Sequence, residues 1–375
     1  MSTRIALFLA CLLTTGHALA EAGVSATTIV IGQSASLSGP TAPRGKEIIG
    51  GIQAYFDQVN AKGGVHGRKL MLDTLDDGYE ADKTLANTKR FISEGKVFAL
   101  IGYRGTSHVA GVVPLLNDAR LPLIAPVTGA DSLRNPAHRF LFHIKASYGD
   151  ETEAIINQFN SFGLKRIAAF YQNDGFGKEG MAGVEAAMKA RNLTLVAKGA
   201  VERNSNDVSN AVKSIAGANP EAVVVIAQFN AAAAFVKGMR ATGSNPLFMA
   251  VSPVEIEQIA KNLGEMARGF AVAQVVPFPW NQGTSLVREY TKAIAGREDV
   301  RAGFASLEGF IAAKVLVEGL RRVGPQPTRE KLVSALETLR DFDLGGYTIS
   351  YSLGNHRGSR YVDLIVIGKD GRFMR

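Results

Sequence analysis

The 375-residue sequence contains one cysteine, Cys11, and one tryptophan. Cys11 lies inside an amino-terminal segment with the features of a secretory signal, so the exported chain would have no thiol and no disulfide. After this segment, no apolar run approaches the ~18 residues that a membrane-spanning helix needs. No tract of low complexity interrupts the chain. These absences favour a soluble exported protein of ordinary globular composition.

The signal-like segment occupies residues 1–20. Arg4 is its single charge, Ile5–Leu13 form a short apolar run, and Ala18-Leu19-Ala20 fits a small-x-small cleavage site. The run is too short for a transmembrane anchor. A lipid-anchored Cys11 is the other alternative, and it is disfavoured because the apolar run continues past the cysteine. Cleavage after Ala20 would deliver the chain to the periplasm.

The formal net charge of +8 raises the question of a nucleic-acid partner. The basic residues, however, are spread along the chain and often adjoin acids, as in Arg340-Asp341. No basic run is longer than a pair such as Arg321-Arg322. We interpret the charge as a solvated surface with a mild preference for anionic ligands, and expect no nucleic-acid partner.

Motifs for catalysis, metals and cofactors are weak or absent. The sequence lacks G-x-S-x-G and H-E-x-x-H, and Ser107-His108 cannot form a local nucleophile–base pair because helical neighbours diverge by roughly 100°. Residues 175–180 match G-x-G-x-x-G, but three residues separate the first glycine from the preceding strand. Residues 39–47 miss the P-loop spacing. We predict no catalytic residue, metal ligand or cofactor, and an enzyme with a site assembled from distant residues remains a lesser alternative.

Strand-like apolar runs alternate with helical patterns along the chain, which is typical of wound α/β sheets. In the first half, strands are expected at 29–33, 69–75, 97–101 and 122–125, and helices at 46–60, 81–94 and 107–118. The series restarts after about residue 145. The second half has expected strands at 166–171, 193–197, 222–227, 247–250 and 270–276, and helices at 178–191, 208–216, 231–241 and 254–263. Residues 284–338 carry at least three helical patterns, and strands are expected at 347–351 and 361–367.

The segment Ser36–Leu70, with its SGP…RG loop and NAKGGVHGRKL turn, resembles the opening of the Leu/Ile/Val-binding proteins, the periplasmic receptors of branched-chain amino-acid ABC importers. The resemblance implies a type I periplasmic-binding fold: two doubly wound parallel-sheet lobes joined by three crossing segments. Lobe I would comprise 21–144 and 276–344, and lobe II 145–275 and 345–375. Crossings are expected near 143–146, 274–277 and 344–347. A monomer that binds a small molecule and an ABC permease is also implied.

The loop Gly102–Ser107 follows a predicted strand and opens a helix, where hydroxyls and free N–H groups form an anion site or simply cap the helix. In the family, the matching loop holds the ligand carboxylate together with residues that follow the next strand. The resemblance thus implies that the ligand contacts Arg104, Thr106, Ser107, Val127, Thr128 and Gly129. Arg104 departs from the small polar residues usual at its position and offers either a bidentate bond to a carboxylate or a solvated charge.

Four residues of the second lobe complete the implied ligand site. Phe176 and Phe229 match aromatic cleft residues that usually are tyrosines, and Tyr148 beside the first crossing is another candidate wall. Ser252 lies where amino-acid-binding relatives carry an acid for the ligand ammonium, and this departure favours a carboxylate without an α-amino group. Glu255, expected on the following helix, is the alternative ammonium acceptor.

The sequence therefore predicts a periplasmic substrate-binding protein of an ABC importer that binds a small amino acid or organic carboxylate between its lobes. The alternative is a ligand-sensing receptor of the same fold that acts on a regulatory partner. A neighbouring permease and ATPase would favour transport, and a neighbouring kinase or regulator would favour sensing.

Overall fold

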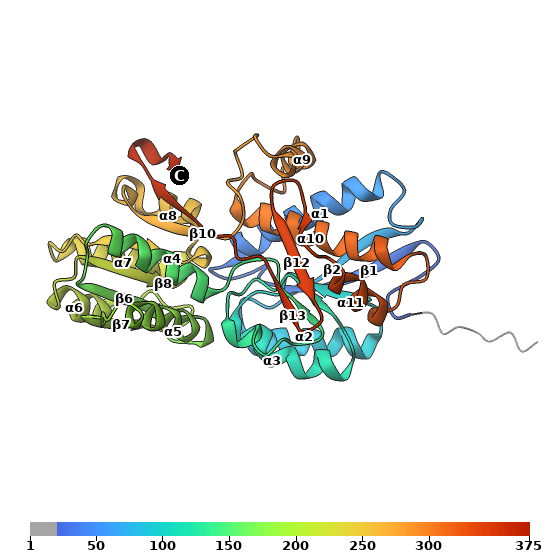
Figure 1. Ribbon diagram of the computed structural model, residues 1–375, viewed down its shortest axis with the longest axis horizontal. Helices are drawn as coiled ribbons and strands as arrows, with labels where there is room; N and C mark the ends of the chain where they lie inside the picture. The colour runs from blue at the N-terminus through green and yellow to red at the C-terminus, as the bar shows by residue number, and fades with distance from the viewer. Residues whose placement is uncertain (1–20) are drawn as a thin grey trace, which may run out of the picture.

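The computed structural model describes residues 21–375, which form two α/β lobes side by side (Figure 1). The expected export signal, residues 1–20, lies outside the described residues. Each lobe is built on a largely parallel sheet with helices packed against it. The prediction of two α/β lobes with parallel sheets is confirmed.

Lobe I contains a five-stranded parallel sheet in the order β2-β1-β3-β4-β5. Its strands are β1 (Thr28–Ala35), β2 (Lys69–Asp76), β3 (Ala99–Ile101), β4 (Leu123–Ile124) and β5 (Leu141–Phe142). Its helices are α1 (Ala42–Asn60), α2 (Ala81–Glu94), α3 (Thr106–Asp118), α9 (Ser285–Ile294), α10 (Phe304–Val323) and α11 (Arg329–Glu337).

Helices α1 and α10 of lobe I pack backbone against backbone. A Cβ atom at Gly51 would lie 1.8 Å from the carbonyl oxygen of Ser306, and one at Gly309 would lie 2.1 Å from that of Ile48. Only glycine fits at such distances, because any side chain would displace the facing backbone. The two helices therefore form one tightly packed pair. Each carries a buried charged residue, Arg44 on α1 and Glu308 on α10.

Lobe II contains a seven-stranded sheet in the order β15-β14-β10-β9-β8-β6-β7. Its strands are β6 (Ile167–Gln172), β7 (Ala197–Val201), β8 (Ala222–Ile226), β9 (Leu247–Ala250), β10 (Ala271–Gln274), β14 (Asp363–Ile367) and β15 (Phe373–Met374). All pairs are parallel except those of β14 with β10 and β15. Its helices are α4 (Tyr148–Ser161), α5 (Gly175–Lys189), α6 (Ser209–Gly217), α7 (Phe229–Ala241) and α8 (Ile256–Leu263). Every residue of the central strand β8 is buried, as expected for a parallel strand covered on both faces.

Expected and observed elements differ most at β7. The strand expected at 193–197 lies instead at Ala197–Val201, where it pairs with β6 from Ala197 opposite Ala168. The preceding residues Leu193 and Leu195 are half-buried against the core, which explains the strand-like alternation of the sequence. The short strands β5, β11, β13 and β15 were not expected.

The chain near its third expected crossing forms a small antiparallel sheet of β11 (Phe342–Asp343), β12 (Thr348–Ser352) and β13 (Asn355–Gly358). The residues of β12 and β13 were expected in lobe II. In the structure they adjoin lobe I, since β13 contacts β5 and the backbone N–H of His143 donates to the carbonyl of His356 (2.9 Å). We therefore propose that the third crossing runs through residues 359–362, between β13 and β14, rather than through 344–347.

A tyrosine hydroxyl links the segments that are expected to cross between the lobes. The hydroxyl of Tyr347 lies within hydrogen-bond distance of the carbonyl oxygens of Ile144 (2.6 Å) and Val275 (2.9 Å), in the segments expected to form the first and second crossings. Tyr351 likewise donates to the carbonyl of His143 (2.7 Å). These bonds join the segments around residues 143–144, 275 and 347–351.

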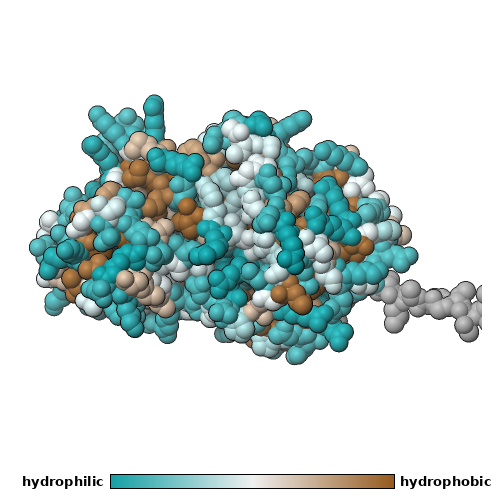
Figure 2. All heavy atoms as spheres, viewed as in Figure 1, coloured by the Kyte–Doolittle hydropathy of each residue, from teal (hydrophilic) through white to brown (hydrophobic). Residues whose placement is uncertain are grey.

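The surface seen in Figure 2 is mainly hydrophilic, with separate hydrophobic areas. Within residues 21–375, no helix combines the length and apolar character that crossing a membrane requires.

Candidate functional site

The loop after β3 places the first group of expected site residues. Gly102 and Gly105 both have positive φ angles, 65° and 99°, and so turn the chain sharply between the strand and α3. Arg104 lies opposite Val127 in an isolated parallel bridge, and the N–H of Val127 donates to the carbonyl of Tyr103 (2.7 Å). The loops that follow β3 and β4 are therefore paired at the carboxyl end of the lobe I sheet, as expected for a ligand site in an open α/β fold.

Two threonines join these loops. The Oγ1 atoms of Thr106, the first residue of α3, and Thr128 lie 2.7 Å apart, and Thr128 Oγ1 also accepts from the N–H of Ala130 (3.2 Å). Both side chains are buried. Because one of the two hydroxyls donates to the other, one O–H beside the start of α3 remains to donate to an anionic group, where the helix dipole favours negative charge.

Tyr148 and Phe176 form an aromatic wall next to the threonines. Their ring centroids lie 5.2 Å apart, and the Tyr148 N–H donates to the carbonyl of Gly129 (2.6 Å). A Cβ at Gly129 would lie 2.4 Å from the tyrosine ring, so glycine is required there for close packing. Phe229 is also buried, at the first residue of α7.

Ser107 contacts the second lobe directly. Its Oγ accepts from the N–H of Gly175 (3.3 Å), the first residue of α5. The lobes are therefore in contact at the expected ligand site, which corresponds to a closed arrangement of the cleft. In this arrangement Ser107 is half-buried and the other nine expected residues are buried, so the site is shielded from solvent.

Arg104 lies at the centre of the lobe interface. Its guanidinium donates to Oε1 of Gln228, sits 4.4 Å from the ring centre of Tyr79, and has Nη2 4.0 Å from Glu255 Oε1. Only 5% of the residue is exposed, and Nη1 has no hydrogen-bond partner among the described residues. Arg104 is thus a buried cation with an unused donor, not a solvated surface charge.

Ser252 is placed near an acid from another element. Its N–H and Oγ both donate to the carboxylate of Glu151 on α4, at 2.6 Å and 3.1 Å. Burial raises the pKa of Glu151 to about 7, despite the opposing effects of Lys145 and these hydrogen bonds. Ser252, which stands where amino-acid-binding relatives carry an acid, therefore binds Glu151, an acid from α4 that was not predicted as a site residue.

Glu255 was expected on the helix that follows Ser252, but it lies before that helix. It precedes α8 with a φ of 61°, a conformation that is uncommon for residues other than glycine, and this turns its side chain into the interface. Glu255 Oε1 lies 3.9 Å from Arg44 Nη1 and has no hydrogen-bond partner among the described residues. Burial raises its pKa to about 7, although Arg44 and Arg104 act in the opposite direction.

Three further charged residues lie with Arg104, Glu151 and Glu255 in one buried cluster, and none of the three was predicted from the sequence. Arg44 of α1 bonds Glu308 of α10 (3.0 Å), and Lys145 in the first crossing lies 2.9 Å from the other oxygen of Glu308. Burial alone would raise the pKa of Glu308, but the charges of Lys145 and Arg44 outweigh it and the pKa is lowered. Glu308 is the only charged residue in the stretch 304–313, which was a usable signal, since a charge is rarely buried without a partner.

A cavity of about 180 Å³ opens between the lobes beside this cluster. It is lined from lobe I by residues of α1 and the start of α10, and from lobe II by residues around the start of α8, with Glu47, Glu255, Glu257, Lys261 and Arg301 as its charged members. Glu255 is the member shared with the buried cluster. None of the ten expected residues lines this cavity.

The motifs considered for other chemistries have structural explanations. Asp174 caps α5 by accepting from the N–H groups of Phe176 (2.9 Å) and Gly177 (3.2 Å), so an acid occupies the position that a nucleotide phosphate would need. Gly177 is required because a Cβ there would lie 1.7 Å from the carbonyl oxygen of Gln172. His108 stacks on Tyr79 with centroids 4.6 Å apart, and burial lowers its pKa to about 4. In residues 21–375 there is no group of three or more His, Cys, Asp or Glu residues that could hold a metal ion.

Comparison with known proteins gives a consistent result. Residues 28–372 match the family model described as "Periplasmic binding protein". A Leu/Ile/Val-binding protein of Rhizobium johnstonii is 24% identical over 85% of this chain and 86% of its own length.

Solved structures agree with the observed fold. A substrate-binding periplasmic protein from Ralstonia solanacearum has 35% identity and a TM-score of 0.86, covering 92% of this chain and 99% of its own. A possible leucine/isoleucine/valine-binding protein from Rhodopirellula baltica has 30% identity and a TM-score of 0.87, covering 96% and 98%. These relatives are named as binding proteins, and the likeness extends across both lobes and the crossings between them.

Proposed function

We propose that this chain, which belongs to the periplasmic binding proteins of the Leu/Ile/Val-binding type, captures a small organic carboxylate between its lobes and presents it to the permease of an ABC importer. The family resemblance predicted from the sequence and its type I fold are confirmed by these comparisons. The ligand class, the permease partner, the monomeric state and export through residues 1–20 are parts of the proposal.

The observation that carries the proposal is the buried Arg104 with its unused Nη1 donor, on the loop that leads to Thr106, whose hydroxyl meets that of Thr128. An unsatisfied buried donor on a cation is costly, and a carboxylate can satisfy it with charge-assisted hydrogen bonds. The remaining O–H of the two threonines and the free N–H groups at the start of α3 supply further donors. Tyr148, Phe176 and Phe229 would then pack against the apolar body of the ligand.

The charge balance of the interface supports an anionic ligand. Three cations, Arg44, Arg104 and Lys145, face three acids, Glu151, Glu255 and Glu308. Burial raises the pKa values of Glu151 and Glu255 to about 7 and lowers the pKa of Lys145, so these three groups are biased toward their neutral forms. The two arginines and Glu308 then leave an excess of positive charge in the cluster. A carboxylate without an ammonium group would compensate that charge. An amino acid would instead place its ammonium beside Glu255.

Closure would follow from contacts that exist only when the lobes meet. Arg104 with Gln228, and Ser107 with Gly175, join the lobes directly. A ligand that bonds Thr128 in lobe I and packs against Phe176 in lobe II would favour this closed state by its differential affinity. The permease would recognise the surface that closure creates.

A thermal-shift screen of residues 21–375 tests the proposal. The compounds are leucine, isoleucine and valine, their deaminated analogues, and aliphatic and aromatic carboxylates and amides. A ligand that binds only the folded state raises the apparent melting temperature by mass action. The proposal expects the largest shift from a carboxylate that lacks an α-amino group, whereas shifts confined to the amino acids would contradict the ligand class.

A further inference from the structure

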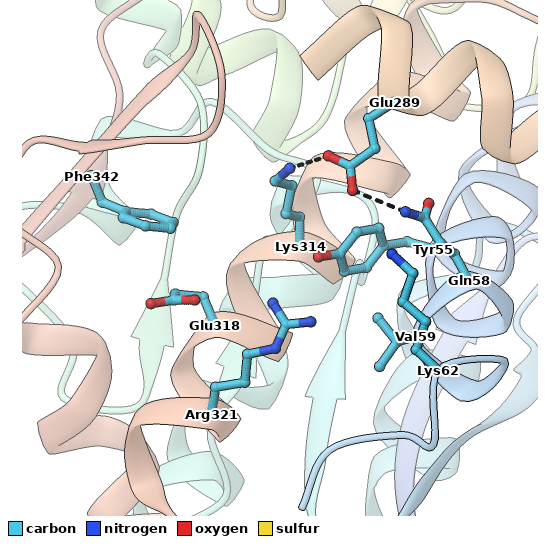
Figure 3. Close-up of a pocket in the computed structure, with 9 residues that line it drawn as sticks. All are labelled: Tyr55, Gln58, Val59, Lys62, Glu289, Lys314, Glu318, Arg321 and Phe342. Carbon is cyan, nitrogen blue, oxygen red and sulfur yellow. Dashed lines mark hydrogen bonds and ion pairs between the residues drawn. The ribbon is translucent and has the colours of Figure 1, made fainter. Parts of the chain in front are cut away.

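A second cavity, of about 240 Å³, lies on lobe I away from the cleft (Figure 3). Its residues come from the carboxyl-terminal half of α1 and the turn that follows it, from α9, from α10 and from β11. We call it the lobe I pocket. Arg44, near the start of α1, reaches the cleft, while Tyr55 of the pocket follows it eleven residues later along the helix. At 1.5 Å per residue these positions are roughly 16 Å apart, so a small ligand cannot occupy both sites.

The acids that line the lobe I pocket are already paired. Glu289 bonds Lys314 through one carboxylate oxygen and accepts from Gln58 Nε2 (3.1 Å) through the other. Glu318 bonds Arg322, which lies outside the lining (2.8 Å). The negative charges in the wall are therefore largely neutralised by the protein itself.

The other two cations of the lining are free. Lys62 and Arg321 have no ion-pair partner among residues 21–375. Figure 3 shows the Arg321 guanidinium pointing toward the hydroxyl of Tyr55, with the Lys62 side chain on the other side of that ring. Burial raises the pKa of Tyr55, so its hydroxyl remains a donor at neutral pH. The Arg321 guanidinium and the Tyr55 hydroxyl thus lie together at one end of the cavity, and Lys62, which like Arg321 is exposed, adds a second cation at its rim.

The opposite end of the lobe I pocket carries the ring of Phe342, whose centre lies 5.4 Å from the Arg322 guanidinium. The ring of Phe342 faces the cavity across from Tyr55 in Figure 3. Tyr55 itself is 3% exposed and is held edge-on against Phe310, with centroids 4.9 Å apart. Tyr55 and Phe342 thus give a mainly charged pocket two aromatic rings against which an apolar group can pack.

We propose that the lobe I pocket is a second ligand site that takes a small organic anion, with one carboxylate or phosphate group between Lys62, Arg321 and the Tyr55 hydroxyl and its apolar body against Phe342. The guanidinium fork suits either oxyanion. An occupant would bridge the tightly packed helices α1 and α10, and so would stabilise lobe I as well as bind to it.

The test uses calorimetric titration of residues 21–375 with phenyl phosphate, benzoate and inorganic phosphate. All titrations use an Arg104→Gln, Thr128→Ala background, which weakens the cleft and separates this site from the proposed function. The test variant is Lys62→Ala with Arg321→Ala. The matched control is Lys89→Ala with Lys237→Ala, which removes the same charge from exposed positions on α2 and α7.

We expect one phenyl phosphate or benzoate per chain, with affinity reduced about tenfold or more in the test variant and unchanged in the control, because two charge-assisted contacts are lost. If the test and control variants lost the same affinity, the loss would come from the change in net charge alone, and the site would be overturned. Absence of saturable binding at millimolar concentration would overturn it too. Inorganic phosphate that binds as tightly as phenyl phosphate would overturn the assignment of an organic ligand.

Discussion

The guanidinium of Arg104 in lobe I donates a hydrogen bond to the side-chain oxygen of Gln228 in lobe II. Arg104 follows β3 and Gln228 directly precedes α7, so the bond joins the edges of the two sheets. Gln228 in turn donates through Nε2 to the hydroxyl of Tyr79 (3.2 Å), whose ring lies beneath the same guanidinium. These contacts require the lobes to be together, and they place a cation at the interface.

Arg104→Gln should weaken ligand binding by about ten- to a hundredfold, because hydrogen bonds to charged groups contribute about 1.5–3 kcal/mol. Glutamine retains a donor but removes the charge and the fork. The matched control is Arg203→Gln, which breaks another bond between the lobes, to Glu80 (3.1 Å), at a partly exposed position. An exposed pair contributes at most about 1 kcal/mol, so the control should lose less than about fivefold. Equal losses in the two variants would remove the special role of Arg104.

Glu151 should make the protein less stable as the pH rises from about 4.5 to about 7. Its pKa is raised in the folded state to about 7, so the folded chain binds more protons than the unfolded chain in this window, and stability falls as pH rises through it. Glu151→Gln mimics the protonated acid and can keep both contacts with Ser252. Relative to the wild type it should gain up to roughly 3 kcal/mol between pH 5 and pH 8.

Urea unfolding of both proteins at pH 5 and pH 8 measures this difference, and other titrating groups cancel in the comparison. The same pH dependence in the two proteins would show that Glu151 ionises normally.

Gly177→Ala should destabilise the protein by roughly 2–3 kcal/mol, because the new methyl group must displace the backbone of Gln172. Gly111→Ala is the control, since Gly111 lies on the exposed face of α3 with no atom within 4 Å of a Cβ. Alanine is the better helix former, so this variant should be neutral or gain up to about 1 kcal/mol. Chemical denaturation gives both values. If Gly177→Ala were as stable as the wild type, the packing explanation of the glycine motif would be wrong.

Trp280, the single tryptophan, should report the relative position of the lobes. Its ring lies 5.7 Å from that of Phe304 at the start of α10 and 5.4 Å from that of Phe373 in β15, so it contacts both lobes. It is 38% exposed. Ligand addition that shifts the population toward closure should change its fluorescence emission, and Trp280→Phe should abolish the signal. Saturating binding by calorimetry without any change in emission would contradict a coupled closure.

Much of the fold could be predicted from local patterns, because buried parallel strands are short apolar runs and amphipathic helices show an apolar period of 3.6 residues. Strands of two to four residues, such as β5 and β15, are too short to show a period. The register of β7 depended on pairing with β6, which no local pattern reveals. The placement of residues 345–358 depended on contacts of β13 with β5, which are also nonlocal.

The candidate site divides in the same way. Thr106, Thr128 and Phe176 follow strands, so their position at a sheet edge could be predicted from sequence order. Arg44 and Glu308 meet only because α1 and α10 pack together across more than 260 residues of chain. Glu255 was misplaced because its positive φ precedes the first turn of α8, which begins at Ile256, two residues later than the expected 254.

The most direct test of an anionic ligand held in the cleft is calorimetric titration of the wild type, Thr106→Ala and Thr128→Ala with the carboxylate selected by the thermal-shift screen and with its α-amino counterpart. The account predicts one site per chain, preference for the carboxylate, and affinity reduced about ten- to a hundredfold in each folded variant. Wild-type affinity in both variants, or submicromolar binding of the amino acid with none of the carboxylate, would contradict it.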